Sequence, residues 1–251
     1  MANPSHQQML QRSVEEWNAW RAQHRDIIPD LKEADLRGSN LIHANLINAN
    51  LYHANLGATL VDGPRLRKAD LTGAILKGAD LLGADLSFAI LTGATLCEAD
   101  LRGAKFTLAD LSSANLSEAS LSGADLIGAN LAGADFSKVY LYETVFGDTN
   151  LTAVRGLETC DHGGPSTLDH RTLAKSGPLP LTFLRGCGLN DWEIKVAKLY
   201  DSGLTAGQVN DILYCIYPLR TNPLIQFYPC FISYASQDLQ RIFPLGNEAT
   251  H

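Results

Sequence analysis

Few residues in this 251-residue chain have the types and spacing that chemistry requires. Cys160 lies two residues before His162, and Asp169 lies directly before His170, so a thiol–imidazole or carboxylate–imidazole pair is conceivable. Nothing in the sequence fixes how these side chains would meet, and a polar loop explains them better. We therefore predict no catalytic residue and no enzymatic activity.

Metal and cofactor sites also lack a sequence signature. The cysteines are widely spaced without a C-x-x-C pair, which is unlike a zinc knuckle or a disulfide framework. They are Cys97, Cys160, Cys187, Cys215 and Cys230. His43 and His53 are ten residues apart, which puts them on opposite sides of the repeat described below. We expect scattered reduced thiols, no metal and no cofactor.

The charge and the apolar pattern exclude further classes. A net charge of −7 disfavours direct nucleic-acid binding, which needs a basic surface. Polar residues break the longest apolar runs, so we expect no membrane span, and "MANPSHQQML" lacks the features of a signal peptide. We expect a cytoplasmic protein with a protein partner of unknown identity. The oligomeric state stays open, with a monomer as the simpler expectation.

A five-residue period covers about half of the chain. Steps of five from Leu31 to Leu151 give 25 central positions, and each holds Leu, Phe or Val. Two residues before each centre is a small residue, which is Ala without a break from Ala69 to Ala134. Asp or Asn mostly precedes the centre directly, and Gly often follows two residues after it. Neither the helical period of 3.6 nor the strand period of 2 puts these leucines on one face.

A chain that turns a corner every five residues satisfies this pattern. Four sides would close a coil of about 20 residues, and coils stacked about 4.8 Å apart would form a rod of about 30 Å. The central side chains would nearly fill the interior, which leaves room for little beyond alanine beside them. Asp and Asn suit the corners because their side chains bond to nearby backbone amides.

The stretch "ADLTGAILKGADLLGADL" closely resembles the pentapeptide-repeat family, whose motif is A(D/N)LXX. The resemblance implies a mainly β fold, a right-handed quadrilateral parallel β-helix, which we assign to residues 30–156. One stretch, 57–65, departs from the motif, because Pro64 falls in the small column and Val61 is a weak centre. Either Val61 is a true centre, or the register slips by one residue and recovers at Leu66. We expect a local bulge or loop there, either as a tolerated irregularity or as a binding protrusion.

Repeat arrays need covered ends. Residues 1–29 are predicted to supply an N-terminal capping helix over 5–24, opened by a capping box of Ser5 and Gln8. Residues 157–228 are predicted to form a helical linker and cap on the last coil, with three helices. Ser166, the pair Asn190 and Glu193, and the pair Thr205 and Gln208 are the predicted N-terminal caps, and Pro218 the stop of the third helix.

Residues 160–238, including "VNDILYCIYPLR" and "CFISYASQD", resemble bacterial proteins that join pentapeptide repeats to a Toll/interleukin-1 receptor (TIR) domain. The matching residues of the TIR opening are Phe231, Ile232, Ser233, Tyr234 and Asp238. A TIR domain needs well over a hundred residues, whereas few follow Asp238. We therefore assign residues 229–251 to a truncated first TIR strand and a tail. The glutamate that cleaves NAD in enzymatic TIR domains would lie downstream, so no residue here inherits its role.

Three functions are open at this point. The first is a non-catalytic interaction or sensor scaffold, originally coupled to a TIR domain. Phe88 and Leu108 are predicted to stack on one face, and Ile75 and Ile90 to point outward on other faces, so these four could form an apolar contact surface. The second is mimicry of DNA at a type II topoisomerase, which the family resemblance suggests. The third is a fragment of a TIR NAD hydrolase whose catalytic part is missing.

Charge counts against mimicry. About 30 Å of duplex carries about 17 charges. Residues 30–155 hold 15 acidic and 10 basic side chains. Lys105 and Arg65 also share a predicted column with Asp85 and Asp125, which interrupts an acidic stripe.

Overall fold

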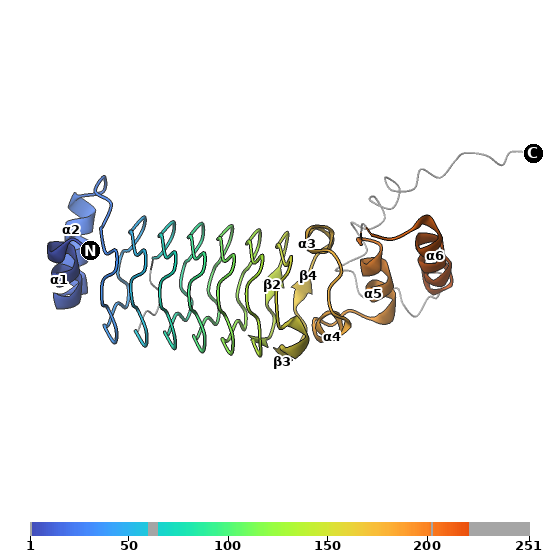
Figure 1. Ribbon diagram of the computed structural model, residues 1–251. Coiled ribbons are helices and arrows are strands. Elements are labelled where there is room, and N and C mark those ends of the chain that lie inside the picture. Colours follow the sequence, from blue (N-terminus) through green and yellow to red (C-terminus); the bar gives the residue numbers. More distant parts are fainter. Residues whose placement is uncertain (1, 60–64, 202, 221–251) are drawn as a thin grey trace, which may run out of the picture. The chain divides into compact units, whose positions relative to one another are not determined.

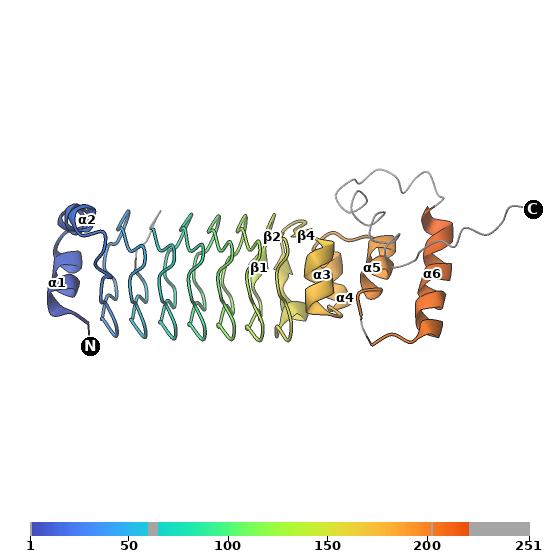
Figure 2. The same ribbon diagram turned by 90° about the horizontal axis from the view of Figure 1, so that it is seen from above.

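The computed structural model describes residues 2–59, 65–201 and 203–220. The chain divides into two compact units, Met1–Gly188 and Leu189–His251, and the predicted helical segment 157–228 straddles their boundary. Figures 1 and 2 show the first unit as a stack of coils, with two helices at its N-terminal end and short strands and helices at its other end.

Each side of a coil pairs with the same side of the next coil. Parallel bridges such as Asp30↔Asn50, Asn50↔Asp70 and Asp70↔Ile90 repeat along the stack. The partners in each bridge are four steps of the five-residue period apart, so each coil has four sides. The prediction of a four-sided parallel β solenoid is thereby confirmed, whereas its right-handed winding stays a prediction.

The period arises from the packing of the core. All central residues of the described part are buried, from Leu31 to Leu151, with at most 1% of their surface exposed. The unbroken alanine column from Ala69 to Ala134 is buried as well. Thr144 and Thr149 continue this small column, and their hydroxyls donate to the carbonyls of Leu121 and Leu126 at 2.8 Å, so no polar group is left unpaired by their burial.

Tight turns with the hydrogen bond and the positive φ of type II turns form most corners of the described coils. The N–H of the small residue donates to the carbonyl of the preceding centre, as from Ala74 to Leu71 at 2.9 Å. The residue two after the centre has a positive φ, which explains the many glycines at this position, such as Gly73 at 63°. Asp and Asn before the centre accept from a backbone N–H two residues on, as Asp70 does from Thr72 at 3.0 Å.

The irregular stretch 57–65 keeps the register at both of its described ends. Thr59 is buried in the small column, and its hydroxyl donates to the carbonyl of Leu56 at 2.7 Å. Arg65 pairs with Asn45 and Asp85, its counterparts in the preceding and following coils, so Leu66 is in frame. Residues 60–64, with Val61 and Pro64, lie outside the described residues.

Two helices, rather than the single predicted helix, precede the coils. They are α1, Pro4–Arg12, and α2, Val14–Gln23. Ser13 separates them in an extended conformation, and its side chain accepts from the N–H of Glu16, which favours a new helix start. The predicted box of Ser5 and Gln8 is wrong, because Asn3 caps α1 and accepts from the N–H of Ser5.

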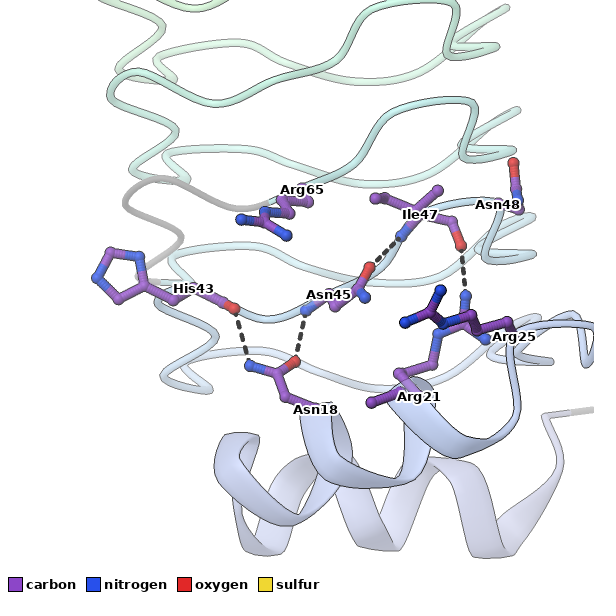
Figure 3. A pocket seen from close by; sticks show the side chains of 9 residues that line it. Asn18, Arg21, Arg25, His43, Asn45, Ile47, Asn48 and Arg65 are labelled. Atoms are coloured by element: carbon purple, nitrogen blue, oxygen red, sulfur yellow. Dashed lines mark hydrogen bonds between the residues drawn. The ribbon is translucent and has the colours of Figure 1, made fainter.

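Side chains of α1 and α2 bond the open backbone edge of the first coil. Trp17, which is fully buried, donates its indole N–H to the carbonyl of Asn45 at 2.9 Å. Asn18 accepts from the N–H of Asn45 at 2.8 Å and donates to the carbonyl of His43 at 3.1 Å (Figure 3). Gln7 and Gln11 both donate to the carbonyl of Asp35. The edge groups that another coil would otherwise pair are thus satisfied by the helices.

After Leu151 the chain makes an incomplete further turn. Strand β1, Tyr140–Leu141, pairs in parallel with β3, Asp161–His162, and β2, Val145–Phe146, pairs with β4, Thr167–Leu168. The short 3₁₀ helix η1, Leu157–Thr159, lies between β2 and β3. These partners follow one and two residues later than the regular coil would place them, which marks the end of the repeat.

Two short helices complete this end, α3, His170–Ser176, and α4, Leu181–Gly186. The predicted cap at Ser166 is wrong, because Asp169 caps α3 and accepts from the N–H of Thr172 at 2.8 Å. Gly177, with a φ of 70°, ends α3. Phe183 of α4 packs edge-on against Phe146, with ring centroids 5.8 Å apart.

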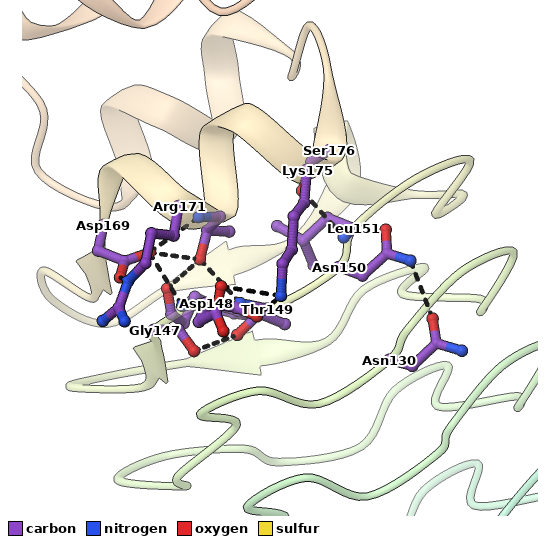
Figure 4. Close-up of polar contacts among 12 residues, drawn as sticks. Asn130, Gly147, Asp148, Thr149, Asn150, Leu151, Asp169, Arg171, Lys175 and Ser176 are labelled. Carbon is purple, nitrogen blue, oxygen red and sulfur yellow. Dashed lines mark hydrogen bonds and ion pairs between the residues drawn. The ribbon is translucent and has the colours of Figure 1, made fainter. Parts of the chain in front are cut away.

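Oxygen atoms of α3 and its cap bond the N–H groups of the last coil (Figure 4). Asp169 accepts from the N–H of Asp148 at 2.9 Å, and Ser176 from that of Leu151 at 2.9 Å. The Thr172 hydroxyl accepts from the N–H of Thr149 at 3.0 Å and donates to the carbonyl of Phe146 at 2.6 Å. This end of the stack is therefore bonded in the same manner as the first.

The second unit contains α5, Asp191–Lys198, and α6, Ala206–Arg220, which contact each other. The predicted capping boxes are confirmed, since Asn190 and Glu193, and likewise Thr205 and Gln208, bond reciprocally. Helix α6 ends at Arg220, two residues after Pro218, its predicted stop.

The TIR-like opening and a membrane span are the two remaining features that the sequence analysis considered. The TIR-like residues Phe231 to Asp238 lie outside the described residues. Within the described part of the chain, no helix combines the length and the apolar character that a membrane crossing demands.

Candidate interaction surface

Bulky apolar side chains gather at one corner of the coils. Phe88 and Leu108 occupy the same turn position in successive coils and are 39% and 54% exposed. Ile127 precedes the same corner in the following coil, where its carbonyl accepts from the N–H of Leu108 at 2.8 Å. Ile90 is separated from Phe88 by one inward residue, Ala89. Ile90 itself belongs to the adjoining column, between Asp70 and Asp110, so we call Phe88, Leu108 and Ile127 the apolar corner.

The backbone conformation at Phe88 and Leu108 is unfavourable for a residue that has a side chain. Phe88 and Leu108 have φ values of 61° and 57°, in the left-handed region that glycine occupies at many of the equivalent turns. A residue with a Cβ there costs about 1 kcal/mol or more. Thirteen other non-glycine residues of the described chain share this positive φ, so the backbone alone does not single out the two positions. What distinguishes Phe88 and Leu108 is a bulky apolar side chain, because the other described non-glycine residues with a positive φ are polar or alanine.

Leu108 and Ile127 also depend on glycines in the next coil. A Cβ built on Gly128 would lie 2.6 Å from Cδ2 of Leu108, so the leucine covers the α-carbon of that glycine. A Cβ on Gly147 would lie 3.2 Å from Ile127 in the same way. The guanidinium of Arg67 lies 5.1 Å from the ring centroid of Phe88, so one cation lies beside the apolar corner.

The four predicted contact residues are all exposed, but they are not all together. Phe88 and Leu108 stand at the same corner, whereas Ile90 lies between Asp70 and Asp110 in the adjoining column. Ile75 is 43% exposed and pairs with Asn55 and Thr95, in a different column. The prediction did not include Ile127. Ile127 and Leu108 occupy different positions of the five-residue motif and become neighbours only when successive coils are stacked.

The two side chains of the conceivable thiol–imidazole pair, Cys160 and His162, are packed against other residues. Burial, and then the charge of Glu158, raise the pKa of Cys160 to about 12, and its thiol lies 3.5 Å from the carbonyl of Phe136. Burial lowers the pKa of His162, whose ring packs against Phe183 with centroids 5.7 Å apart. A neutral thiol without a base cannot act as a nucleophile.

The other candidate side chains have structural roles. Asp169 caps α3, as described above. Within the described ranges, the four cysteines that they include are free, and no group of three His, Cys, Asp or Glu side chains is placed to hold a metal ion.

Comparison with known proteins decides the family. The model for pentapeptide repeats matches eight copies, over residues 30–59, 65–103, 79–117, 104–141 and 119–155. HetL, a pentapeptide-repeat protein involved in heterocyst differentiation regulation in the cyanobacterium Nostoc sp. strain PCC 7120, is 31% identical over 54% of this chain and 72% of its own, with a TM-score of 0.37. The chain belongs to the pentapeptide-repeat proteins.

Other solved pentapeptide-repeat structures are similar to this chain. Rfr23 from the cyanobacterium Cyanothece 51142 is 35% identical over 40% of this chain and 64% of its own, with a TM-score of 0.35. QnrB1, a plasmid-mediated fluoroquinolone resistance protein, is 19% identical over 68% of this chain and 85% of its own, with a TM-score of 0.36. No curated protein matches the chain.

The charges of this pentapeptide repeat alternate along one side, as predicted. Successive bridges place Arg65, Asp85, Lys105 and Asp125 next to one another in a single column. Some other cations of the repeat are paired with acidic residues, as Arg102 is with Asp100 and Lys138 with Glu118. The acidic residues of the repeat therefore form no continuous stripe on this side.

Proposed function

We propose that this protein is a non-catalytic interaction scaffold that binds a protein partner through the apolar corner. Pentapeptide-repeat proteins are generally non-catalytic and act through protein interactions. The observation that carries the proposal is the exposure of two bulky apolar side chains, Phe88 and Leu108, at turn positions where the other described non-glycine residues are polar or alanine. Leucine, phenylalanine and alanine fill the interior of the coils, so the repeat offers its outer surface for binding.

The partner that fits this surface is a protein with an apolar groove. Aromatic and aliphatic anchors in such a groove supply most of the energy of many interfaces. Arg67, beside Phe88, would meet a carboxylate or a carbonyl at the rim of the groove.

Site-specific crosslinking tests the proposal. A photoreactive phenylalanine at Leu108 should crosslink a protein in the source cell. The same residue at Ser113 is the matched control, because Ser113 is an exposed turn residue with the same φ of 57° at another corner. Equal crosslinking from both positions would contradict a defined contact surface.

Affinity measurements with the purified partner complete the test. Asparagine suits both the left-handed backbone and water, so Phe88→Asn and Leu108→Asn remove the apolar contact without new strain. Each should weaken binding by at least about tenfold, the loss of one good anchor. Unchanged dissociation constants, measured by calorimetry, would mean that the scaffold uses another surface.

Mimicry of DNA at a type II topoisomerase is the alternative. The alternating column of Arg65, Asp85, Lys105 and Asp125 counts against it, because duplex DNA presents charge of one sign. A gyrase supercoiling assay distinguishes the two functions. Inhibition at low micromolar protein, retained in the Leu108→Asn variant, would favour mimicry.

We further propose a cytoplasmic location and an original coupling to a TIR domain. The coupling is supported by the sequence resemblance of residues 160–238 alone. The TIR-like opening, Phe231 to Asp238, lies outside the described residues. The third hypothesis, a fragment of an NAD hydrolase, predicts no activity for this chain alone. Incubation with NAD should leave the dinucleotide intact, and measurable hydrolysis would overturn the assignment as a non-enzyme.

A further inference from the structure

A cavity of about 910 Å³ lies between α2 and the neighbouring coils, and its wall is basic although the protein is acidic. Three arginines line it, Arg21, Arg25 and Arg65, together with His43 and three asparagines. Figure 3 shows Arg65 extending from the coil on one side and Arg21 and Arg25 on the other. None of the described residues that line the cavity is acidic.

Arg21 is the unusual member of this wall. It is only 5% exposed, and its guanidinium donates to the carbonyls of His24, Ile27 and Ile47 at 3.3, 2.8 and 3.0 Å. Its Nε, also buried, has no partner among the described residues. Carbonyls satisfy hydrogen bonds but carry no net charge, so the buried positive charge is left without a counter-charge.

Arg25 and Arg65 lack the aspartate partner that three arginines of the repeat have. Arg37, Arg102 and Arg155 each form an ion pair with an aspartate. Neither Arg25 nor Arg65 forms such a pair within the described part of the chain, and both are exposed. Asp85, next to Arg65 in its column, accepts from the N–H of Ser87 at 3.1 Å and is not part of the cavity wall.

Polar donors for an uncharged part of a ligand are present as well. The side-chain nitrogen of Asn45 and the side chain of Asn48 line the cavity and have no partner among the described residues. Ala22 and Ile47 supply apolar surface. A volume of this size is typical of sites for small molecules.

We propose that this cavity binds a phosphorylated small molecule of about the size of a mononucleotide. The phosphates would lie between Arg25 and Arg65, close to the fixed charge of Arg21. The planar fork of arginine matches the oxygens of a carboxylate and of a phosphate alike. The three positive charges in one wall favour the group that carries more than one negative charge, which is a phosphate rather than a single carboxylate. The site is separate from the apolar corner, so it stands or falls independently of the proposed protein contact.

Calorimetric titration of the full chain with ADP and with pyrophosphate tests the site. Both probes should bind the unmodified protein. Arg25→Gln and Arg65→Gln should each weaken binding of both probes by at least about tenfold, since each removes one charged, bidentate contact. Arg102→Gln is the matched control, an exposed arginine elsewhere in the repeat, and should leave the affinity unchanged.

Each other result contradicts a stated part of the proposal. Absence of binding of both probes at millimolar concentration, or equal affinity in Arg25→Gln and Arg65→Gln, would overturn the site. Citrate binding as tightly as ADP would show that any polyanion suffices. Pyrophosphate binding without ADP binding would overturn the size of the ligand. Equal melting temperatures of the variants establish that lost binding is not lost folding.

Discussion

Leu108 lies over Gly128, the residue at the same corner of the next coil. The contact couples two turns that are neighbours in the stack but distant in the chain. Leu108 can occupy this position only because Gly128 has no methyl group there.

Gly128→Ala should therefore destabilise the protein more than Gly83→Ala. Both glycines have positive φ, 68° and 64°, so each alanine carries the same backbone penalty of about 1 kcal/mol. Only at Gly128 does the new methyl group also meet Leu108, because nothing lies within 4 Å of a Cβ at Gly83. Chemical denaturation measures the difference, which Leu108→Ala in the same chain should remove.

Leu108→Asn should leave the free energy of unfolding unchanged or raise it slightly, by up to about 1 kcal/mol. Asparagine tolerates the left-handed backbone, and the leucine side chain is half exposed, so little packing is lost. Leu111→Asn, a buried centre, is the comparison and should unfold the protein. A large loss of stability in Leu108→Asn would mean that folding, rather than binding, retains the leucine.

Thr172→Val should lower the free energy of unfolding by about 2 kcal/mol. The variant keeps the shape of the side chain but leaves the buried N–H of Thr149 and the carbonyl of Phe146 without their hydroxyl partner. Thr152→Val removes a hydrogen bond at an exposed site and should cost far less. Equal effects of the two substitutions would contradict a role of α3 in bonding the last coil.

Stability should fall in acid partly through Asp169. Burial raises the pKa of this carboxyl, but hydrogen bonds from the N–H groups of Asp148 and Thr172, the Thr172 hydroxyl and Arg171 outweigh it and lower the pKa. A lowered folded-state pKa contributes stability above the unfolded pKa, near 4, which is lost as pH falls through the folded value. Asp169→Asn should therefore be less stable than the unmodified chain at pH 7, and the gap should shrink below about pH 4. A gap that does not change with pH would contradict this account.

Cysteine labelling at pH 8 should separate the thiols by burial. Cys215 is exposed and should react fast, whereas Cys160 and Cys187, whose pKa values burial raises to about 12, should react only on unfolding. Mass spectrometry of the labelled peptides measures each rate. Fast labelling of Cys160 in the folded protein would indicate a reactive thiol and would support a thiol–imidazole site with His162.

The repeat could be predicted because one local requirement determines the residue type at each position of the motif. A central Leu111 must be buried, a neighbouring Ala114 must be small, and Gly73 must turn, so five letters specify one side of a coil. The same reasoning could not place Ser13 between two helices or Asp169 at the start of α3, because several polar residues nearby can cap equally well. The basic cavity depends on α2 lying against the coils, and no sequence pattern brings Arg21 and Arg65 together.

The pairing of each side with the same side of the next coil sets a rule for how such a chain can grow or shrink. An insertion of one whole coil keeps every column in line and leaves both bonded ends as they are. An insertion of a single repeat preserves the local motif but rotates all that follows by a quarter turn. Placed between Phe88 and Leu108, it would send the two side chains to different edges. Gene changes that keep the motif can thus still abolish the surface, and the gain or loss of a whole coil leaves it intact only outside the coils that carry Phe88, Leu108 and Ile127.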